Sequence, residues 1–435
     1  MCLLLIIRIN RFIIGTVKQR SEVRFMRIPE YVSRAMQKLS DAGFESYLVG
    51  GCVRDFLMNK NPHDYDLTTS ALPNQMTDVF SEERIIDTGL KHGTLTLLTE
   101  SGALEITTYR VDGDYDDNRH PSTVSFTRNI NEDLSRRDFT INAMAMSANG
   151  DIIDLFGGKE DIEKRVIRCV GAPGRRFGED GLRIMRAMRF ASVLDFSVEA
   201  GTADAARRLR GLLDGISAER INSELSKLLC GAGAARIFTD FQDIMQTVLP
   251  EVSRDAMAKF AVLLPDLPNV LTVRLAMLFS LCPDARDRAQ HALTRLKFSN
   301  AAARQVLSCV SFLSNPPDAQ RVSVARAASD MGYDLLYASL DAMDAAARKN
   351  AVLYTQSEVS ALRDIAADLQ SSQTPLAVSE LCISGEDIIS AGAKRGPEIG
   401  RILNNLLQSV INNETVNTRE NLISSARKMI QSRKR

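Results

Sequence analysis

LVGGCVRD, residues 48–55, is typical of a short apolar strand that ends in two glycines and continues as a helix. Glycines permit a tight turn and the close approach of a ligand, and the N–H groups at a helix start can hold phosphate oxygens. Arg54 lies one turn into the predicted helix, within reach of the same phosphates. The pattern also suits an ordinary strand–helix turn, so it does not define a site by itself.

Two carboxylates follow this turn in the triplet Asp64-Tyr65-Asp66. Residues i and i+2 of a strand point to one face, so we expect Asp64 and Asp66 to project together. Adjacent carboxylates are best tolerated when they share a hard divalent cation such as Mg²⁺, and a two-metal site would serve phosphoryl chemistry. A solvated turn is the alternative. Glu105, in the β-rich stretch 104–110, is the candidate third carboxylate, with an exposed strand glutamate as its alternative.

Two further motifs concentrate arginine and acidic residues. Arg137 and Asp138 lie in RRDFTINAMA (136–145), where guanidinium groups suit phosphates and a carboxylate suits a ribose hydroxyl. A second motif, GEDGLRIMRAMR (178–189), spaces polar residues three apart along one predicted helix. Its polar members are Asp180, Arg183, Arg186 and Arg189. Surface charge and an amphipathic surface helix are the respective alternatives.

The chain divides into two kinds of sequence near residue 160. Before it, β-rich segments alternate with helical spacing, and 130–138 and 141–146 are predicted to be helical. After it, strand signals stop and Ala/Leu/Arg-rich stretches show apolar positions every three or four residues. The predicted fold class is an α/β head followed by an all-helical chain. The final 45 residues contain nine Lys/Arg and three Asp/Glu, so they form a basic tail.

Composition excludes several classes of protein. The 435 residues contain 54 Lys+Arg and 54 Asp+Glu, which argues against a uniformly basic nucleic-acid binder but permits a local basic face. The two nearest of seven cysteines, Cys282 and Cys309, are 27 residues apart, which excludes CxxC motifs and predicts reduced thiols in a cytoplasmic protein.

Residues 1–25 are interpreted as a dispensable leader of uncertain status, and their apolar runs are too short to span a membrane.

The ordered set of motifs resembles the class II, bacterial-type tRNA nucleotidyltransferases that add CCA. The segments are LVGGCVRD, HDYDLTT, EITTYRVDGDYDDNRHPSTVSF, EDLSRRDFTINAMA and GEDGLRIMRAMRFA, with GAKRGPEIGRILNNLL near the C-terminus. The resemblance implies a polymerase-beta-like palm in the head and a division into head (26–160), neck (161–230), body (231–315) and tail (316–435). It also implies template-independent addition of C, C and A to the tRNA 3′ end from CTP and ATP.

The same resemblance implies a role for each candidate residue. Asp64 and Asp66 would hold Mg²⁺, and Gly51, Arg54 and Arg137 would bind the triphosphate, with Asp138 near the ribose. Asp180 and Arg183 would read the base edge, while Arg186 and Arg189 would contact phosphates. Three basic residues of the tail are predicted to bind tRNA: Lys394, Arg395 and Arg401.

Some alternatives stay open at the level of sequence. Bacterial poly(A) polymerases share the head and neck motifs, and a catalytically silent RNA-binding module is a rival of another class. The acidic segment 112–121 departs from the basic-flanked loop of the family; we expect it to move between C and A addition and to distinguish the chain from CC-only relatives. The oligomeric state is not predicted.

Overall fold

The computed structural model describes residues 28–89, 93–113, 124–351 and 354–432. Two compact units result. The first contains the described residues up to Lys164 together with Arg168–Ala172, and the second contains Arg165–Ile167 and everything described from Pro173 onward.

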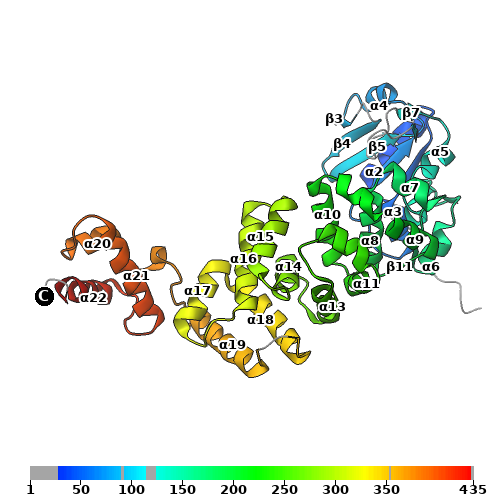
Figure 1. The fold of residues 1–435 in the computed structure, drawn as a ribbon. Coiled ribbons are helices and arrows are strands. Elements are labelled where there is room, and N and C mark those ends of the chain that lie inside the picture. The colour runs from blue at the N-terminus through cyan, green and yellow to red at the C-terminus, as the bar shows by residue number, and fades with distance from the viewer. Residues whose placement is uncertain (1–27, 90–92, 114–123, 352–353, 433–435) are drawn as a thin grey trace, which may run out of the picture. The chain divides into compact units, whose positions relative to one another are not determined.

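The first unit is built around a seven-stranded mixed sheet of order β3-β4-β5-β2-β1-β8-β9. Figure 1 labels β3, β4 and β5 of this sheet. Its strands are β1 (Ser46–Val49), β2 (Asp66–Thr69), β3 (Arg84–Gly89), β4 (Thr94–Thr99), β5 (Gly102–Thr108), β8 (Met144–Met146) and β9 (Ile152–Asp154). Among the described strands of this sheet, only β2 and β5 pair in parallel, and the other neighbours are antiparallel. A separate hairpin pairs β6 (Arg110–Asp112) with β7 (Val124–Phe126).

Alternation along the strands decides which side chains face the core. On β5, Leu104, Ile106 and Thr108 are buried, and Glu105 between them is exposed. Side chains of successive strand residues point to opposite faces, so Glu105 lies on the open face of the sheet. Tyr47 and Val49 of β1 pack with Leu134 in one apolar cluster.

The helices of the first unit are α2 (Glu30–Asp41), α3 (Gly51–Leu57), α4 (Pro73–Val79), α5 (Ile130–Ser135) and α6 (Gly158–Glu163), with a 3-10 turn, η2 (Thr140–Asn142). The helix predicted over 141–146 is wrong: η2 leads directly into β8. Met144, Ala145 and Met146 are all fully buried between β1 and β9, and such a continuous apolar run cannot be told from a helix by periodicity.

The second unit is helical. Its α-helices are α7 (Pro173–Glu179), α8 (Leu182–Leu194), α9 (Ala200–Arg208), α10 (Ala218–Leu229), α11 (Ala234–Asp240), α12 (Gln242–Val248), α13 (Arg254–Leu263), α14 (Leu271–Ser280), α15 (Ala285–Arg295), α16 (Asn300–Ser314), α17 (Arg321–Met331), α18 (Tyr333–Arg348), α19 (Gln356–Ser371), α20 (Gly385–Ser390), α21 (Pro397–Ile411) and α22 (Arg419–Ser432). Shorter 3-10 turns are η3 (Arg210–Gly215), η4 (Leu264–Asp266) and η5 (Val378–Glu380).

Two features refine the predicted fold class, which the structure confirms. A pair of two-residue parallel strands, β10 (Val166–Ile167) and β11 (Ser197–Val198), lies beyond the point where strand signals stop. The helices from α20 onward share a hydrophobic cluster in which Ile388, Leu406 and Leu422 are fully buried. None of the described helices is long and apolar enough to span a membrane.

Candidate active site

The turn after β1 is the centre of the site in the first unit. Gly50 has φ +74°, a conformation that favours glycine, and α3 begins at the next residue. A Cβ atom placed on Gly50 would lie 3.4 Å from Arg137 Nη1 and 3.9 Å from Asp66 Oδ2. A guanidinium group and a carboxylate from two other parts of the chain therefore both lie close to this turn.

Arg54 is held beside the same turn by two acceptors. Its Nη1 donates to Asn142 Oδ1 at 2.9 Å, and its Nε and Nη2 donate to Asp55 Oδ1 at 2.9 and 2.8 Å. A Cβ atom on Gly51 would lie 3.5 Å from Arg54 Nη2. Asn142 is 88 residues away in sequence and was not predicted as a site residue, although it lies within the quoted motif 136–145.

The carboxylates meet across the parallel pair of strands. Asp66 on β2 is the register partner of Glu105 on β5, so the two side chains lie on one face. Asp64 lies before β2, which begins at Asp66, so the expectation that both aspartates belong to one strand is wrong. The pKa of Asp66 is raised above its ordinary value. The main cause is that the surrounding protein partly removes its carboxylate from water, and the negative charges of Glu105 and Asp64 add to the shift, while the positive charge of Arg137 opposes it.

Asp64, Asp66 and Glu105 are suitable ligands for a divalent cation, because all three carry oxygen donors. The negative charges around Asp66 also favour a bound cation. Over the residues that the structure describes, however, no three His, Cys, Asp or Glu side chains are gathered closely enough to form a complete metal site. Asp64, Asp66 and Glu105 thus provide oxygen ligands for a cation, but they do not form a complete coordination site by themselves.

Arg137 is bound on its far side by a buried carboxylate that sequence reasoning missed. Asp133, with 0% exposure, accepts from Arg137 Nη2 at 3.1 Å through Oδ2 and from Arg136 Nη2 at 2.8 Å through Oδ1. Its position four residues before Arg137 was the available signal, because such pairs meet on a helix. Asp138 is nearly buried, and its Oδ1 accepts from the Phe139 amide at 2.8 Å.

In the second unit, Asp180 and Arg183 lie at the junction of two helices. Asp180 falls between α7 and α8, so the prediction of one helix carrying all four polar residues is wrong. Its Oδ1 instead accepts from the Leu182 amide at 3.0 Å near the start of α8. Arg220 Nη2 donates to Asp180 Oδ2 at 2.8 Å, and Arg183 Nη1 donates to Glu179 Oε2 at 2.5 Å.

The remaining two arginines of α8 are packed against protein groups. Arg189 donates to Glu224 and lies with its guanidinium carbon 3.7 Å from the centre of the Phe190 ring. Arg186 lies 5.4 Å from the centre of the same ring. Cation–π contacts of this kind hold a guanidinium group in place. Glu179, Arg220 and Glu224 are further residues that the sequence did not single out.

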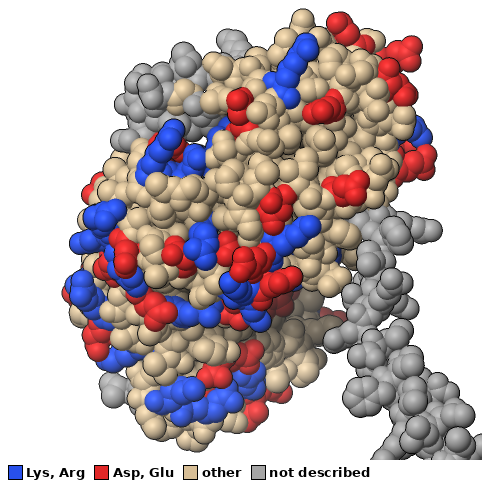
Figure 2. Space-filling model, turned by 90° about the vertical axis from the view of Figure 1, so that its right-hand side faces the viewer, with Lys and Arg blue, Asp and Glu red and all other residues tan. Residues whose placement is uncertain are grey.

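The predicted RNA-binding residues are on the surface of the second unit. Lys394 and Arg395 lie between α20 and α21, Arg401 lies on α21, and all three are exposed. Arg395 lies 3.7 Å from Glu386. Figure 2 draws a different face, the right-hand side of the view in Figure 1, on which basic side chains are interspersed with acidic ones, as expected from the balanced composition.

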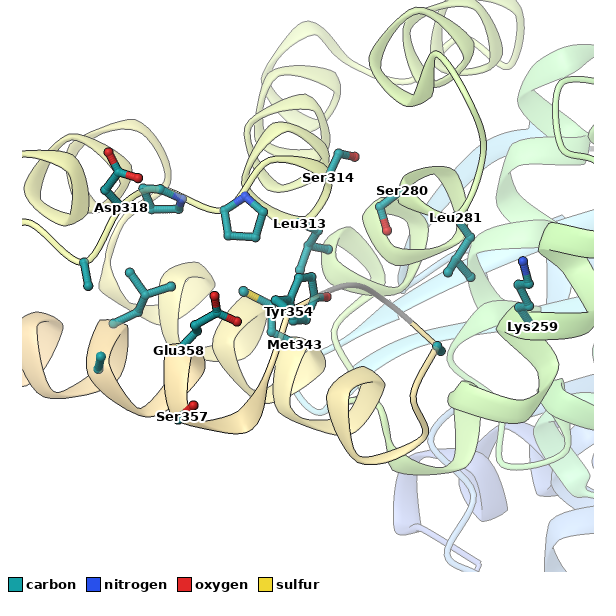
Figure 3. A pocket seen from close by; sticks show the side chains of 16 residues that line it. Lys259, Ser280, Leu281, Leu313, Ser314, Asp318, Met343, Tyr354, Ser357 and Glu358 are labelled. Carbon is teal, nitrogen blue, oxygen red and sulfur yellow. The ribbon is translucent and has the colours of Figure 1, made fainter.

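A cavity of about 760 Å³ in the second unit involves none of the predicted site residues. Figure 3 shows Tyr354, Glu358 and Leu313 among its lining side chains. Most of the acidic segment 112–121 lies outside the described residues, as does the leader 1–25.

Comparison with known proteins identifies the family. Residues 46–168 match the poly A polymerase head domain, residues 195–255 match the probable RNA and SrmB-binding site of polymerase A, and residues 273–426 match the putative domain 2 of tRNA nucleotidyltransferase. The CCA-adding enzyme of Lactobacillus delbrueckii subsp. bulgaricus is 36% identical over 405 residues, covering 90% of this chain and 97% of the relative. The chain belongs to the CCA-adding enzyme family.

Other members of this family are similar to this chain over nearly its whole length. The CCA-adding enzyme of Lactococcus lactis subsp. cremoris is 34% identical, covering 94% of this chain and 99% of its own. The crystal structure of the Bacillus stearothermophilus CCA-adding enzyme in complex with CTP has a TM-score of 0.74 at 28% identity, covering 93% of this chain and 98% of that one. The Thermotoga maritima CCA-adding enzyme complexed with tRNA shares the fold, with a TM-score of 0.63 at 19% identity.

Membership of the CCA-adding enzyme family confirms the resemblance found in the sequence and makes the protein an enzyme of the tRNA nucleotidyltransferase class. It also confirms the polymerase-beta-like head within the first unit. The family implies a divalent metal, in keeping with the carboxylates at β2 and β5.

Proposed function

We propose that this protein adds C, C and A to the 3′ end of tRNA, using CTP and ATP and no nucleic-acid template. The observation that carries the proposal is that Arg137 Nη1 and Asp66 Oδ2 approach the same turn, 3.4 and 3.9 Å from the position of a Cβ on Gly50, in a chain of the CCA-adding enzyme family. A cationic group that can bind the triphosphate and a carboxylate that can hold a metal ion thus lie at one turn, as nucleotidyl transfer requires.

The proposed nucleotide contacts follow the quoted motifs. Gly51, Arg54 and Arg137 bind the triphosphate and Asp138 contacts the ribose. Asp180 and Arg183 read the base edge. Arg186 and Arg189 contact the nucleotide phosphates. The solved relatives named for their complexes with CTP and tRNA support both ligands as partners of this chain.

The proposed cofactor is Mg²⁺, held by Asp64 and Asp66 with Glu105 beside them. Bound Mg²⁺ would neutralise charge on the attacking and leaving oxygens of an in-line displacement. The arginines of this chain orient the triphosphate so that its α-phosphate faces the tRNA 3′-hydroxyl, and the carboxylates keep the site anionic enough to retain cations.

Extension of a tRNA that lacks its 3′ CCA tests the proposal. The tRNA is incubated with Mg²⁺ and CTP, ATP, UTP or GTP, singly and together, and the products are resolved at single-nucleotide length. We expect two additions with CTP alone and a third once ATP is present. Arrest after two residues with both nucleotides present would mean that a separate enzyme adds the A. Absence of any extension would favour an RNA-binding module.

Poly(A) synthesis is the second candidate function. It is favoured by one observation, the match of residues 46–168 to the poly A polymerase head domain. The same assay separates the two functions, because a poly(A) polymerase would produce a long ladder with ATP alone, whereas CCA addition stops after the third nucleotide.

Three further parts of the proposal concern organisation. We propose the division into head (26–160), neck (161–230), body (231–315) and tail (316–435), with tRNA contacts through Lys394, Arg395 and Arg401. We also propose the cytoplasm as the compartment, where tRNA and nucleoside triphosphates are available.

A further inference from the structure

Asp133 is a fully buried carboxylate between two arginines of the first unit. Its Oδ1 accepts from Arg136 Nε at 3.0 Å and Nη2 at 2.8 Å, and its Oδ2 accepts from Arg137 Nη2 at 3.1 Å. Burial alone would raise the pKa of Asp133, but the charges and hydrogen bonds of the two arginines outweigh it and hold the pKa below its usual value. The carboxylate is therefore ionised and paired at neutral pH.

Arg137 connects this buried anion to the Gly50 turn. One terminal nitrogen, Nη2, is bound by Asp133, while the other, Nη1, lies 3.4 Å from the position of a Cβ on Gly50. The guanidinium group is planar and rigid, so fixing one nitrogen fixes the direction of the other. Arg137 Nε is buried and has no hydrogen-bond partner among the described residues, so it adds no further restraint on this orientation.

We propose that Asp133 is a positioning residue that directs Arg137 toward the triphosphate of the incoming nucleotide. The inference rests on the proposed function and deepens it by assigning a residue that touches no substrate. A purely structural role is the competing explanation, because Asp133 also accepts from the Arg110 amide at 3.4 Å at the start of β6.

The first test is the Asp133→Asn substitution, which keeps the shape and removes the charge. We expect the KM for CTP and for ATP to rise by about tenfold or more, as for the loss of a charge-assisted hydrogen bond. We expect the KM for tRNA to stay unchanged. An equal rise in the KM for all substrates, or a loss of kcat alone, would overturn the proposal.

A double-mutant cycle separates positioning from structure. If Asp133 acts through Arg137, Asp133→Asn adds nothing to the KM for CTP in an Arg137→Ala background, because interacting residues are not additive. Additive effects of the two substitutions would overturn the proposal. Should Asp133→Asn not fold, Asp133→Glu retains the charge but displaces it, and the same cycle and outcomes apply.

Asp161 provides a matched control within the first unit. It is 4% exposed and accepts from Arg168 Nε at 3.2 Å and from Thr140. Asp161→Asn removes a comparably buried charge, so we expect it to lower the Tm as Asp133→Asn does, while the KM for CTP stays at the wild-type value. A matching rise in KM would mean that any lost buried charge disturbs the site, and the positioning role would fail.

Calorimetric binding of CTP to the full-length protein without tRNA distinguishes this inference from the proposed function. If the wild-type protein binds CTP but extends no tRNA, the proposed function fails, while a weaker Kd in Asp133→Asn still supports positioning. If extension occurs and the Kd for CTP is the same in both proteins, the positioning role fails alone.

Discussion

Asp66 and Glu105 lie directly opposite one another on β2 and β5, the only parallel pair in the described seven-stranded sheet. The chain passes from β2 through α4, β3 and β4 before it reaches β5, so strand pairing brings together two carboxylates that are distant in sequence. The result is a pair of like charges on one open face, with Arg137 near enough to oppose their repulsion.

Removal of either aspartate of the DYD triplet is expected to abolish both C and A incorporation. Loss of charge neutralisation at the reacting oxygens costs several kcal/mol, so Asp64→Ala or Asp66→Ala should lower kcat by about a thousandfold. Filter binding checks that tRNA affinity is retained. Substantial residual extension in Mg²⁺ by either variant would contradict the assignment.

Asp66 should also make the stability of the protein depend on pH. Its pKa is raised above 3.8, so the folded chain binds this proton more tightly than the unfolded chain. The free energy of unfolding therefore falls as pH rises from about 3.8 through the raised pKa. In chelator at neutral pH, Asp66→Asn should have a higher Tm than the wild-type protein, and this advantage should disappear below that window.

Added Mg²⁺ provides the second arm of this test, because it should raise the Tm of the wild-type protein at neutral pH more than that of Asp66→Asn. Asp151→Asn is the control, since Asp151 is exposed in the same unit. An identical Mg²⁺ response in all three proteins would place cation binding elsewhere.

Base selection is expected to depend on Asp180 and Arg183. Cytosine and adenine each present an amino donor beside a ring-nitrogen acceptor, whereas uracil and guanine present a carbonyl beside a ring N–H. Sites that pair such groups can reject a mismatch by about 10⁴-fold. Asp180→Ala and Arg183→Ala should lower kcat/KM for CTP and ATP and narrow their advantage over UTP and GTP.

The neighbours of these residues sharpen the prediction. Glu179 binds Arg183 and Arg220 binds Asp180, so Glu179→Gln and Arg220→Gln should weaken discrimination less than the direct substitutions do. Competition kinetics with mixed nucleotides measure the ratio. Equal loss of rate on all four nucleotides would mean that the pair only shapes the pocket.

Tail contacts with tRNA predict a change in salt dependence. Neutralising Lys394, Arg395 and Arg401 together should lower the slope of log affinity against log salt by about two to three units, since each phosphate contact contributes about 0.7 to 0.9. The KM for tRNA should rise while the KM for CTP stays constant. All three side chains are exposed, so the triple alanine variant is expected to fold.

A second triple alanine variant serves as the control for net charge. It replaces three exposed basic residues of the first unit: Arg34, Lys159 and Lys164. If both triple variants reduce the salt slope equally, the effect reflects total charge, and a specific tail contact is refuted.

Local sequence was sufficient for features that depend on near neighbours. The apolar strand that ends at Gly50-Gly51 and the helix that follows it were predicted, as was the helical character of the chain beyond residue 160, because apolar spacing and turn chemistry act within a few residues. The ordered motifs also established the family. The helix predicted over 141–146 failed, because burial on both faces hides the period of a strand.

Tertiary structure decided which groups meet. Asp66 faces Glu105 only because β2 and β5 pair in parallel, and Arg54 is held by Asn142 from 88 residues away. The burial of Asp133, which turns a common acidic residue before two arginines into a fixed anion, likewise depends on the packed first unit. The sequence by itself determined the residue types and their spacing along the chain, whereas long-range strand pairing and burial determined their partners and their charge states.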